Sequence, residues 1–170
     1  MPDLSYGWSK LTGEFLGDLA VKKYGLNVAI YRPFSGYGED QAETYPFPSI
    51  IKRVVNKENP IKVWGDGEQS RDFIYIEDCI TGILKTYEAI NDASSINLGT
   101  GVKTTFIDLI KLACRINDVP YNVEKLLDKP VGVYARYCNP EKQKKFGFLP
   151  KYNIEDGIKI VSEYIKNKIK

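Results

Sequence analysis

A tyrosine and a lysine stand four positions apart near the start of the chain, in the segment Tyr6-Gly7-Trp8-Ser9-Lys10. In a helix, side chains at positions i and i+4 share one face, so these two would lie together. A neighbouring ammonium favours the phenolate and lowers the pKa of a tyrosine hydroxyl. Because the sequence contains no histidine, such a phenol is the candidate general base of the chain.

The same spacing occurs three times, so context has to separate the pairs. We expect Tyr121 and Lys125 to lie at a strand edge, and Tyr164 and Lys168 on a solvated terminal helix. The first pair differs because it opens segment 9–23, which has apolar residues at helical spacing and is followed by a strand-like run. The first pair is therefore the one with a predicted catalytic role.

The elements that must position this pair alternate between helical and strand-like patterns, which predicts an α/β fold. The runs 61–64 and 72–76 flank an Asp-Gly turn and are expected to pair as a hairpin. In the helix predicted at 78–90, one face carries Ile80, Ile83, Leu84 and Tyr87. The other expected elements are helices at 9–23, 48–56, from Thr104 or Thr105 onward and at 154–165, strands at 26–31 and 95–98, and a loop at 35–48.

Composition excludes several classes of protein. The 24 basic and 22 acidic residues nearly balance, which gives no reason to expect nucleic acid or a membrane surface as a partner. No apolar stretch approaches membrane-spanning length, and the first residues lack a signal-peptide layout, so a cytoplasmic protein is predicted. Cys79, Cys114 and Cys138 lie far apart, which predicts reduced, partly buried thiols and no metal site.

Four sequence marks follow one another along the chain. In this order they resemble the extended short-chain dehydrogenase/reductase family, the NAD-dependent nucleotide-sugar epimerases and dehydratases. The 63–78 mark is the most specific of the four. The marks are Tyr6 and Lys10 followed by RPFSGYG at 32–38, VWGDGEQSRDFIYIED at 63–78, NLGTG at 97–101, and NPEK at 139–142 with FGF at 146–148.

The resemblance assigns roles to residues at the start of the chain. It implies that Tyr6 is the catalytic base and that Lys10 holds the nicotinamide ribose of NAD while tuning the tyrosine. It places Phe34 at the nicotinamide end of the cofactor and Ser35 at the substrate. Ser35 stands where the family usually has asparagine, and Gly36 follows it in place of a β-branched residue.

The resemblance also assigns a nucleotide-binding role to the 63–78 segment. It implies that Arg71 grips the nucleotide diphosphate, and a guanidinium fork does suit phosphate oxygens. The alternative is a surface ion pair of Arg71 with Asp72 or Glu77. Gly67 and Gln69 fall where related enzymes contact the nucleotide.

A second basic contact to phosphate is expected later in the chain. Both Lys129 and Arg136 match it, and the sequence does not choose between them. A base for inverting a sugar carbon is sought among Glu39, Asp40 and Glu43, for which a solvated acidic loop is the alternative.

The dinucleotide-binding half of the family has no counterpart in the sequence, since no G-x-G-x-x-G occurs. We therefore expect the C-terminal part of a Rossmann-like enzyme with its smaller α+β substrate-binding domain, and weak or no NAD binding by this chain. The predicted parts are the catalytic helix and strand at 1–35, a substrate-binding segment at 36–77, a return to the Rossmann-like layer at 78–101, and the substrate-binding domain at 102–170.

By resemblance, the preferred function is transient oxidation of a GDP-, UDP- or dTDP-linked sugar to a keto-sugar, followed by epimerisation. The epimerase is preferred because the 63–78 segment and the region of Arg136 look similar to GDP-mannose epimerases. A 4,6-dehydratase or a reductase is the alternative. An alternative of another class is a non-catalytic remnant that binds nucleotide sugars or contacts a subunit. An exposed apolar surface and a homo-oligomer are also expected.

Overall fold

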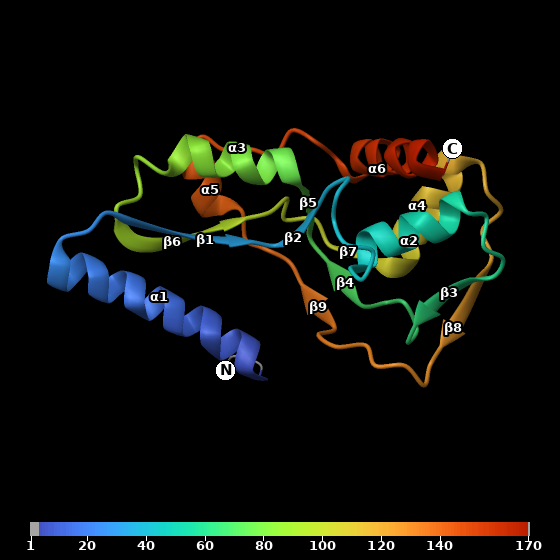
Figure 1. Ribbon diagram of the computed structural model, residues 1–170, viewed down its shortest axis with the longest axis horizontal. Coiled ribbons are helices and arrows are strands. Elements are labelled where there is room, and N and C mark those ends of the chain that lie inside the picture. Colours follow the sequence, from blue (N-terminus) through green and yellow to red (C-terminus); the bar gives the residue numbers. More distant parts are fainter. Residues whose placement is uncertain (1–3, 170) are drawn as a thin grey trace.

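Two parallel strands with helices on both sides form one region of the molecule (Figure 1). The computed structural model describes residues 4–169. The helix α1 (Leu4–Tyr24) ends at Gly25, whose φ of 64° suits a helix C-terminus. The chain then enters β1 (Val28–Pro33), which pairs in parallel with β6 (Asp92–Leu98). The predicted helix and strands are therefore present: α1 and β6 are longer than predicted, and β1 is shifted by two residues.

The helices α3 (Ile76–Thr86) and α5 (Glu141–Lys145) lie across these strands from α1 (Figure 1). The buried side of α3 is not the predicted apolar face, because Ile80, Leu84 and Tyr87 are exposed. A close approach at Gly82 explains the difference, since a Cβ there would meet Leu98 and Phe148 at 3.0 and 2.9 Å. The residues of α3 that are buried are Asp78, Cys79, Gly82 and Thr86.

A second region gathers three helices around the main hydrophobic core (Figure 1). They are α2 (Pro46–Val55), α4 (Phe106–Asn117) and α6 (Ile154–Ile169). Of the two predicted caps, Thr104 and Thr105, the one that caps α4 is Thr105, whose hydroxyl accepts a hydrogen bond from the Asp108 amide at 3.0 Å. The largest wholly buried core residues here are Phe47, Ile51, Ile61, Leu109, Ile110 and Ile158.

The predicted hairpin is wrong. The strand β3 (Ile61–Trp64) pairs in parallel with β8 (Val123–Leu126), which lies about sixty residues later in the sequence. Gly65 and Gly67 have φ values of 66° and 77°, and this turn sends the chain into a different sheet.

Two small sheets connect the two regions. In one, β4 (Ser70–Arg71) lies between the antiparallel β7 (Thr104–Thr105) and the parallel β9 (Ala135–Arg136). In the other, β2 (Ser35–Tyr37) pairs in parallel with β5 (Phe73–Tyr75). The predicted loop at 35–48 thus begins as a strand.

Exposure of apolar side chains is concentrated on α1. Phe15 is 64 % exposed and Leu16 is 54 % exposed, which matches the expected apolar surface. The three cysteines are buried and unpaired, as predicted. Within residues 4–169, no helix is both long enough and apolar enough to cross a bilayer.

Candidate functional site

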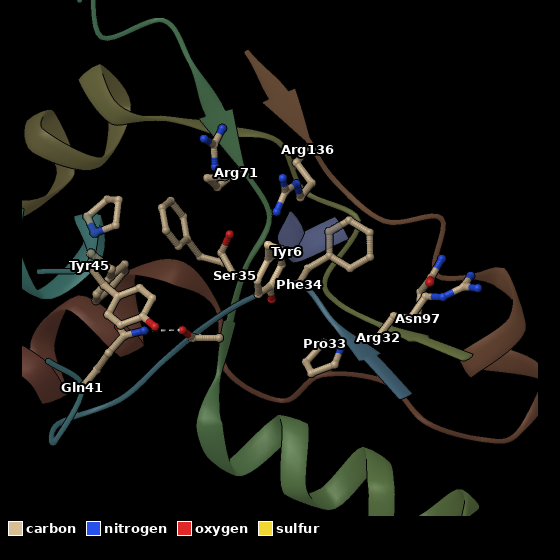
Figure 2. Close-up of a pocket in the computed structure, with 14 residues that line it drawn as sticks. Tyr6, Arg32, Pro33, Phe34, Ser35, Gln41, Tyr45, Arg71, Asn97 and Arg136 are labelled. Carbon is tan, nitrogen blue, oxygen red and sulfur yellow. Dashed lines mark hydrogen bonds between the residues drawn. The ribbon is translucent and has the colours of Figure 1, made fainter. Parts of the chain in front are cut away.

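A cavity of about 560 Å³ opens where the carboxyl ends of β1 and β6 meet β4 and β9 (Figure 2). In open α/β sheets, the carboxyl ends of parallel strands are where ligands bind. Arg32 and Asn97, which lie opposite each other in the β1–β6 register, both reach this end. The cavity is lined by Tyr6, Arg32, Pro33, Phe34, Ser35, Gly36, Gln41, Tyr45, Pro46, Phe47, Arg71, Phe73, Asn97 and Arg136.

Two arginines lie side by side at this cavity, because Arg71 of β4 is in register with Arg136 of β9. Nη1 of Arg71 donates to the carbonyls of Ser70 and Val133 at 2.7 and 2.8 Å, and its guanidinium lies 5.6 Å from the ring centroid of Phe106. Burial, followed by the neighbouring Arg136 charge, lowers the pKa of Arg71. Two adjacent cations of this kind suit an anion with more than one phosphate.

The alternative ion pairs for Arg71 are wrong. Asp72 instead accepts hydrogen bonds from Thr100, Gly101 and Cys138. Glu77 accepts from the hydroxyl of Tyr152 at 2.6 Å. The guanidinium is therefore held by carbonyls and by an aromatic ring.

The tyrosine–lysine pair lies on α1, as its spacing predicts. The amine of Lys10 lies 5.4 Å from the centroid of the Tyr6 ring, and the tyrosine side chain is well exposed. Tyr6 lines the main cavity and also a hollow of about 550 Å³ between α1 and β1, which Lys10 lines as well. The phenol thus stands between the two spaces.

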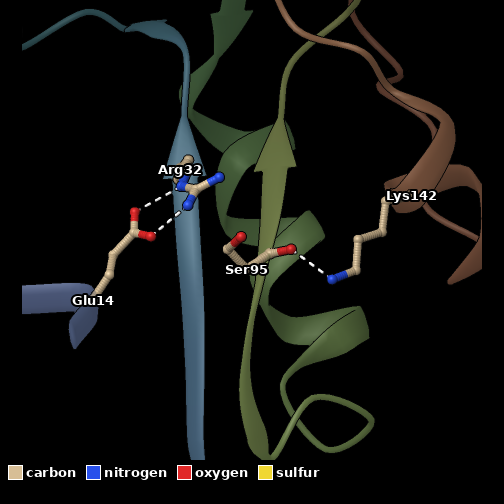
Figure 3. Close-up of polar contacts among 4 residues, drawn as sticks. All are labelled: Glu14, Arg32, Ser95 and Lys142. Atoms are coloured by element: carbon tan, nitrogen blue, oxygen red, sulfur yellow. Dashed lines mark hydrogen bonds and ion pairs between the residues drawn. The ribbon is translucent and has the colours of Figure 1, made fainter. Parts of the chain in front are cut away.

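An ion pair fixes α1 to β1 next to this hollow (Figure 3). Nε of Arg32 donates to one carboxylate oxygen of Glu14 at 2.6 Å, and Nη2 donates to the other. The hydrogen bonds from Arg32 lower the pKa of Glu14. At the edge of β6 that faces away from β1, Lys142 of α5 donates to the carbonyl of Ser95 at 2.6 Å (Figure 3). Each strand of the pair is therefore tied to a helix by a polar contact.

The other residues expected at the nucleotide are only partly brought together. Phe34 and Ser35 line the main cavity with Tyr6. Gln69 lines a neighbouring cavity of about 230 Å³ shared with Arg71, and its Nε2 donates to the Trp64 carbonyl at 2.7 Å.

Gly67 lines neither of these two cavities. A Cβ at this position would meet Ile107 at 2.7 Å, and the Gly67 carbonyl accepts a hydrogen bond from the Ile107 amide. Gly67 therefore packs against the first turn of α4. It does not line either cavity in which a nucleotide contact was expected.

The two candidates for a second basic contact are separated by the structure. Arg136 lines the main cavity, whereas Lys129 lines neither this cavity nor the neighbouring one. The amine of Lys129 lies 3.3 Å from a carboxylate oxygen of Asp128. Strand register, which the sequence does not reveal, places Arg136 beside Arg71.

The three loop carboxylates lie outside the main cavity, around a separate hollow of about 420 Å³ next to α6. Glu39 accepts from the Tyr75 hydroxyl, Asp40 from the Tyr164 hydroxyl, and Glu43 from Lys52. The geometry therefore favours the solvated-loop interpretation. It also puts Tyr164 of the third tyrosine–lysine pair in a contact that the sequence did not predict.

Four polar residues of the cavity were missed as site residues, and one of them, Arg32, opens the recognised RPFSGYG segment at 32–38. Asn97 belongs to the recognised NLGTG segment, so its place after a strand was an available signal. Gln41 and Tyr45 come from the loop before α2 and carry no pattern in the sequence. The amide of Gln41 donates to the Gly36 carbonyl at 2.9 Å, which holds this loop against the cavity (Figure 2).

The fold and the cavity define an α/β, Rossmann-like protein with a ligand site at the carboxyl ends of its strands. The structure of RMD from Pseudomonas aeruginosa complexed with NADPH matches it with a TM-score of 0.90 at 20 % identity, over 99 % of this chain and 58 % of that one. UDP-glucuronic acid 4-epimerase from Bacillus cereus, in complex with UDP-glucuronic acid and NAD, matches with a TM-score of 0.84 at 28 % identity, over 96 % and 52 %.

The model of the NAD dependent epimerase/dehydratase family matches residues 2–99, and the chain belongs to this family. It is 32 % identical to a putative UDP-glucose 4-epimerase of Methanocaldococcus jannaschii, over 95 % of this chain and 53 % of the relative. Its relatives include UDP-sugar epimerases, GDP-sugar synthases and dTDP-sugar dehydratases. The chain spans about half the length of the curated relatives that it matches.

Proposed function

We propose that the chain is the nucleotide-sugar-binding and catalytic-base part of an NAD-dependent nucleotide-sugar epimerase. The observation that carries this proposal is that Tyr6 and the adjacent Arg71 and Arg136 line one cavity. A nucleotide sugar carries a diphosphate next to a hexose, so the arginines would bind the first group and the phenol would act on the second.

Polar residues of the lining would orient the sugar. The hydroxyl of Ser35 and the amide of Asn97 both belong to the lining and can hydrogen-bond sugar hydroxyls. Arg71 is held in place by two carbonyls and an aromatic ring, so little conformational entropy is lost when it binds phosphate. The substrate would thus be positioned before any chemical step.

The residues present fit the nicotinamide end of NAD and not its pyrophosphate. Tyr6 and Lys10 flank the hollow between α1 and β1, where a phenol and an amine could bind ribose hydroxyls, and Phe34 lies at the end of β1. The sequence contains no Gly-rich turn that would hold a dinucleotide pyrophosphate. NAD would supply the hydride acceptor, and this chain alone is expected to bind it weakly.

The proton in this reaction would be moved by Tyr6. As a phenolate, it would accept the proton of the sugar hydroxyl at the carbon being oxidised, and as a phenol it would return this proton. The Lys10 ammonium lies 5.4 Å from the centroid of this ring, on the same face of α1. The two arginines would hold the diphosphate throughout.

Among the possible reactions, the geometry favours inversion at the same carbon that is oxidised. It needs one base only, whereas dehydration or inversion at a neighbouring carbon also needs a base for a C–H proton. Among the described residues, no aspartate or glutamate belongs to the cavity lining, and Glu39, Asp40 and Glu43 lie around a different hollow. A dehydratase, a reductase and a non-catalytic nucleotide-sugar-binding or subunit-contact module are the alternatives.

Calorimetric titration of the chain with UDP-glucose, GDP-mannose, dTDP-glucose and free glucose tests the binding part of the proposal. We expect one nucleotide sugar to bind, free glucose not to bind, and Arg71→Ala to weaken binding about a hundredfold, as loss of a charged phosphate contact implies. The control is Arg115→Ala, which removes an exposed ion pair with Glu155, and neither of these residues lines the cavity. Equal binding by wild type and Arg71→Ala would contradict the proposal.

Turnover in deuterium oxide by an enzyme that contains this segment tests the catalytic part. Inversion at the oxidised carbon leaves the product free of deuterium, because the hydride returns to the carbon it left. Incorporation at a neighbouring carbon would instead indicate a dehydratase or another epimerase. We expect Tyr6→Phe to abolish turnover and to leave UDP-glucose binding intact, a result that a non-catalytic module would not give.

A further inference from the structure

A carboxylate without solvent exposure follows the proposed phosphate-binding Arg71. Asp72 accepts four hydrogen bonds, all from neutral donors. One oxygen accepts from the Thr100 amide at 2.9 Å and the Thr100 hydroxyl at 2.6 Å. The other accepts from the Gly101 amide at 2.9 Å and the Cys138 amide at 3.2 Å. Burying a charge is costly, and these bonds offset that cost.

The backbone of the same residue joins two further parts of the cavity. The amide of Asp72 donates to the carbonyl of Arg136 at 3.0 Å, and the carbonyl of Asp72 accepts from the amide of Ser35 at 2.9 Å. The residues that donate to the Asp72 carboxylate come directly after two other strands. Thr100 and Gly101 follow β6, which carries Asn97, and Cys138 follows β9, which carries Arg136. One residue therefore connects the segments that bring Ser35, Asn97, Arg71 and Arg136 to the cavity.

The surroundings of this carboxylate leave no room for movement. A Cβ at Gly99 would lie 2.7 Å from both an oxygen of Asp72 and the sulfur of Cys138. Gln143, also without exposure, accepts from the Gly99 amide at 3.0 Å and donates to the Gly99 carbonyl at 2.7 Å. Burial and then the nearby Asp72 charge raise the pKa of Cys138 to about 12. The turn at 99–101 is thus fixed from both sides.

Resting on the proposed diphosphate site, we propose that Asp72 is a positioning residue that sets the spacing of the Arg71 and Arg136 guanidiniums for a diphosphate. The two like charges repel each other, and this repulsion tends to separate β4 from β9. The amide of Asp72 donates to the Arg136 carbonyl and its carboxylate accepts from the Cys138 amide, and both bonds tie the carboxyl end of that short parallel strand pair. A diphosphate contacts both guanidiniums and depends on their spacing, whereas a monophosphate needs only one.

The ratio of the affinities for UDP and UMP, both measured by calorimetry, reports on the spacing of the two guanidiniums in the folded protein. We expect wild type to bind UDP more tightly than UMP. Asp72→Asn preserves side-chain volume but turns an amide group toward N–H donors. It should weaken UDP binding about tenfold, equivalent to about 1.4 kcal/mol, and UMP binding less than about twofold. Thr100→Val removes the 2.6 Å hydroxyl bond to Asp72 and the 3.1 Å bond that this hydroxyl accepts from the Val102 amide, and it should lower the UDP to UMP preference in the same direction.

A second buried carboxylate provides the control. Asp78 is 2 % exposed, accepts from the amides of Lys151 and Tyr152 at 2.9 and 3.0 Å, and belongs to neither cavity lining. Asp78→Asn should lower stability, as Asp72→Asn does, and should leave the UDP to UMP preference unchanged. A purely structural role for Asp72 would give the same result as this control.

The outcomes separate the inference from the function on which it rests. Equal affinity of wild type for UDP and UMP, or no affinity for either, would overturn the proposed diphosphate site itself. Discrimination by wild type that persists in Asp72→Asn, or that is lost equally in Asp78→Asn, would overturn the positioning role alone. If Asp72→Asn does not fold, Thr100→Val decides by the same criterion.

Discussion

The helices α1 and α4 have apolar residues at helical spacing, yet their surroundings differ. On α4, Leu109 and Ile110 are without exposure, because α2 and α6 pack against them. On α1, Phe15 and Leu16 are exposed, and contact with the sheet occurs around Gly17, where a Cβ would lie 3.2 Å from Val28. One helix is enclosed by the chain and the other is covered on one side.

This difference between α4 and α1 has a consequence for the proposed function, because the binding residues lie next to the enclosed core and the catalytic residue lies on the exposed helix. Arg71 and Arg136 lie on paired strands next to the main core, and the strand register places them side by side. Tyr6 lies on α1, whose position depends on the sheet contact and on the Glu14–Arg32 ion pair. We therefore expect the chain to bind nucleotide sugars on its own. Catalytic geometry should depend on further protein surface that covers α1.

The largest predicted contrast concerns stability. Ile110→Ala removes a core side chain and should lower the free energy of unfolding by about 2–5 kcal/mol. Leu16→Ala, on the exposed side of α1, should change it by less than about 0.5 kcal/mol. Urea denaturation of the two variants measures both values. Equal destabilisation would mean that the apolar side of α1 is covered, for example by a second copy of the chain, and light scattering would then detect the oligomer.

The second-largest predicted contrast is in the rates of thiol labelling of the sheet region and the main core. Cys79 lies in the small core beside the β1–β6 sheet, and Cys114 lies in the main core. Burial raises the pKa of both thiols, that of Cys79 to about 11, so labelling at pH 8 requires local opening. We expect Cys79 to react at least about tenfold faster than Cys114, because the smaller core should open more readily. Peptide mapping after timed labelling gives both rates, and faster reaction of Cys114 would reverse the comparison.

The cap of α4 should have a moderate effect. Thr105→Ala removes the hydroxyl that accepts from the Asp108 amide and should lower stability by about 1 kcal/mol. Thr105→Ser retains an acceptor and serves as the matched control. Both values come from urea denaturation, and equal losses in the two variants would show that the cap contributes nothing.

The smallest effect concerns the ion pair that fixes α1. Because the folded-state pKa of Glu14 is lowered, its contribution is complete above the ordinary pKa of a glutamate. It is lost as the pH falls through the lowered value. The pair is partly exposed, so we expect less than about 1 kcal/mol. Urea denaturation at pH 7 and pH 3 should show a smaller loss on acidification for Glu14→Gln than for wild type. Identical losses would exclude a role of this pair in acid sensitivity.

Local sequence signals predicted the elements whose determinants are local. The capping residue Thr105, the stop at Gly25 and the period of α6 all lie within the elements that they define. The predicted hairpin was wrong because β3 pairs with β8, and the main core determines this pairing. The predicted buried face of α3 was wrong. The helix packs closely at Gly82 and buries Asp78, and this orientation leaves Ile80 and Leu84 exposed.

The candidate site shows the same division. Context singled out Tyr6 and Lys10, since their spacing occurs three times, and the family resemblance singled out Arg71 through the 63–78 mark. The choice between Lys129 and Arg136 was not possible, because it depends on the register of β9 against β4. Asp72 was considered only as an ion-pair partner, since its actual donors come from segments that are distant in the sequence.

A crystal structure of the chain with UDP-glucose tests the central claim most directly. We predict that the diphosphate lies between the guanidiniums of Arg71 and Arg136 and that the hexose lies toward Tyr6 in the same cavity. A diphosphate bound at Lys129, or a hexose directed away from the phenol, would contradict the account.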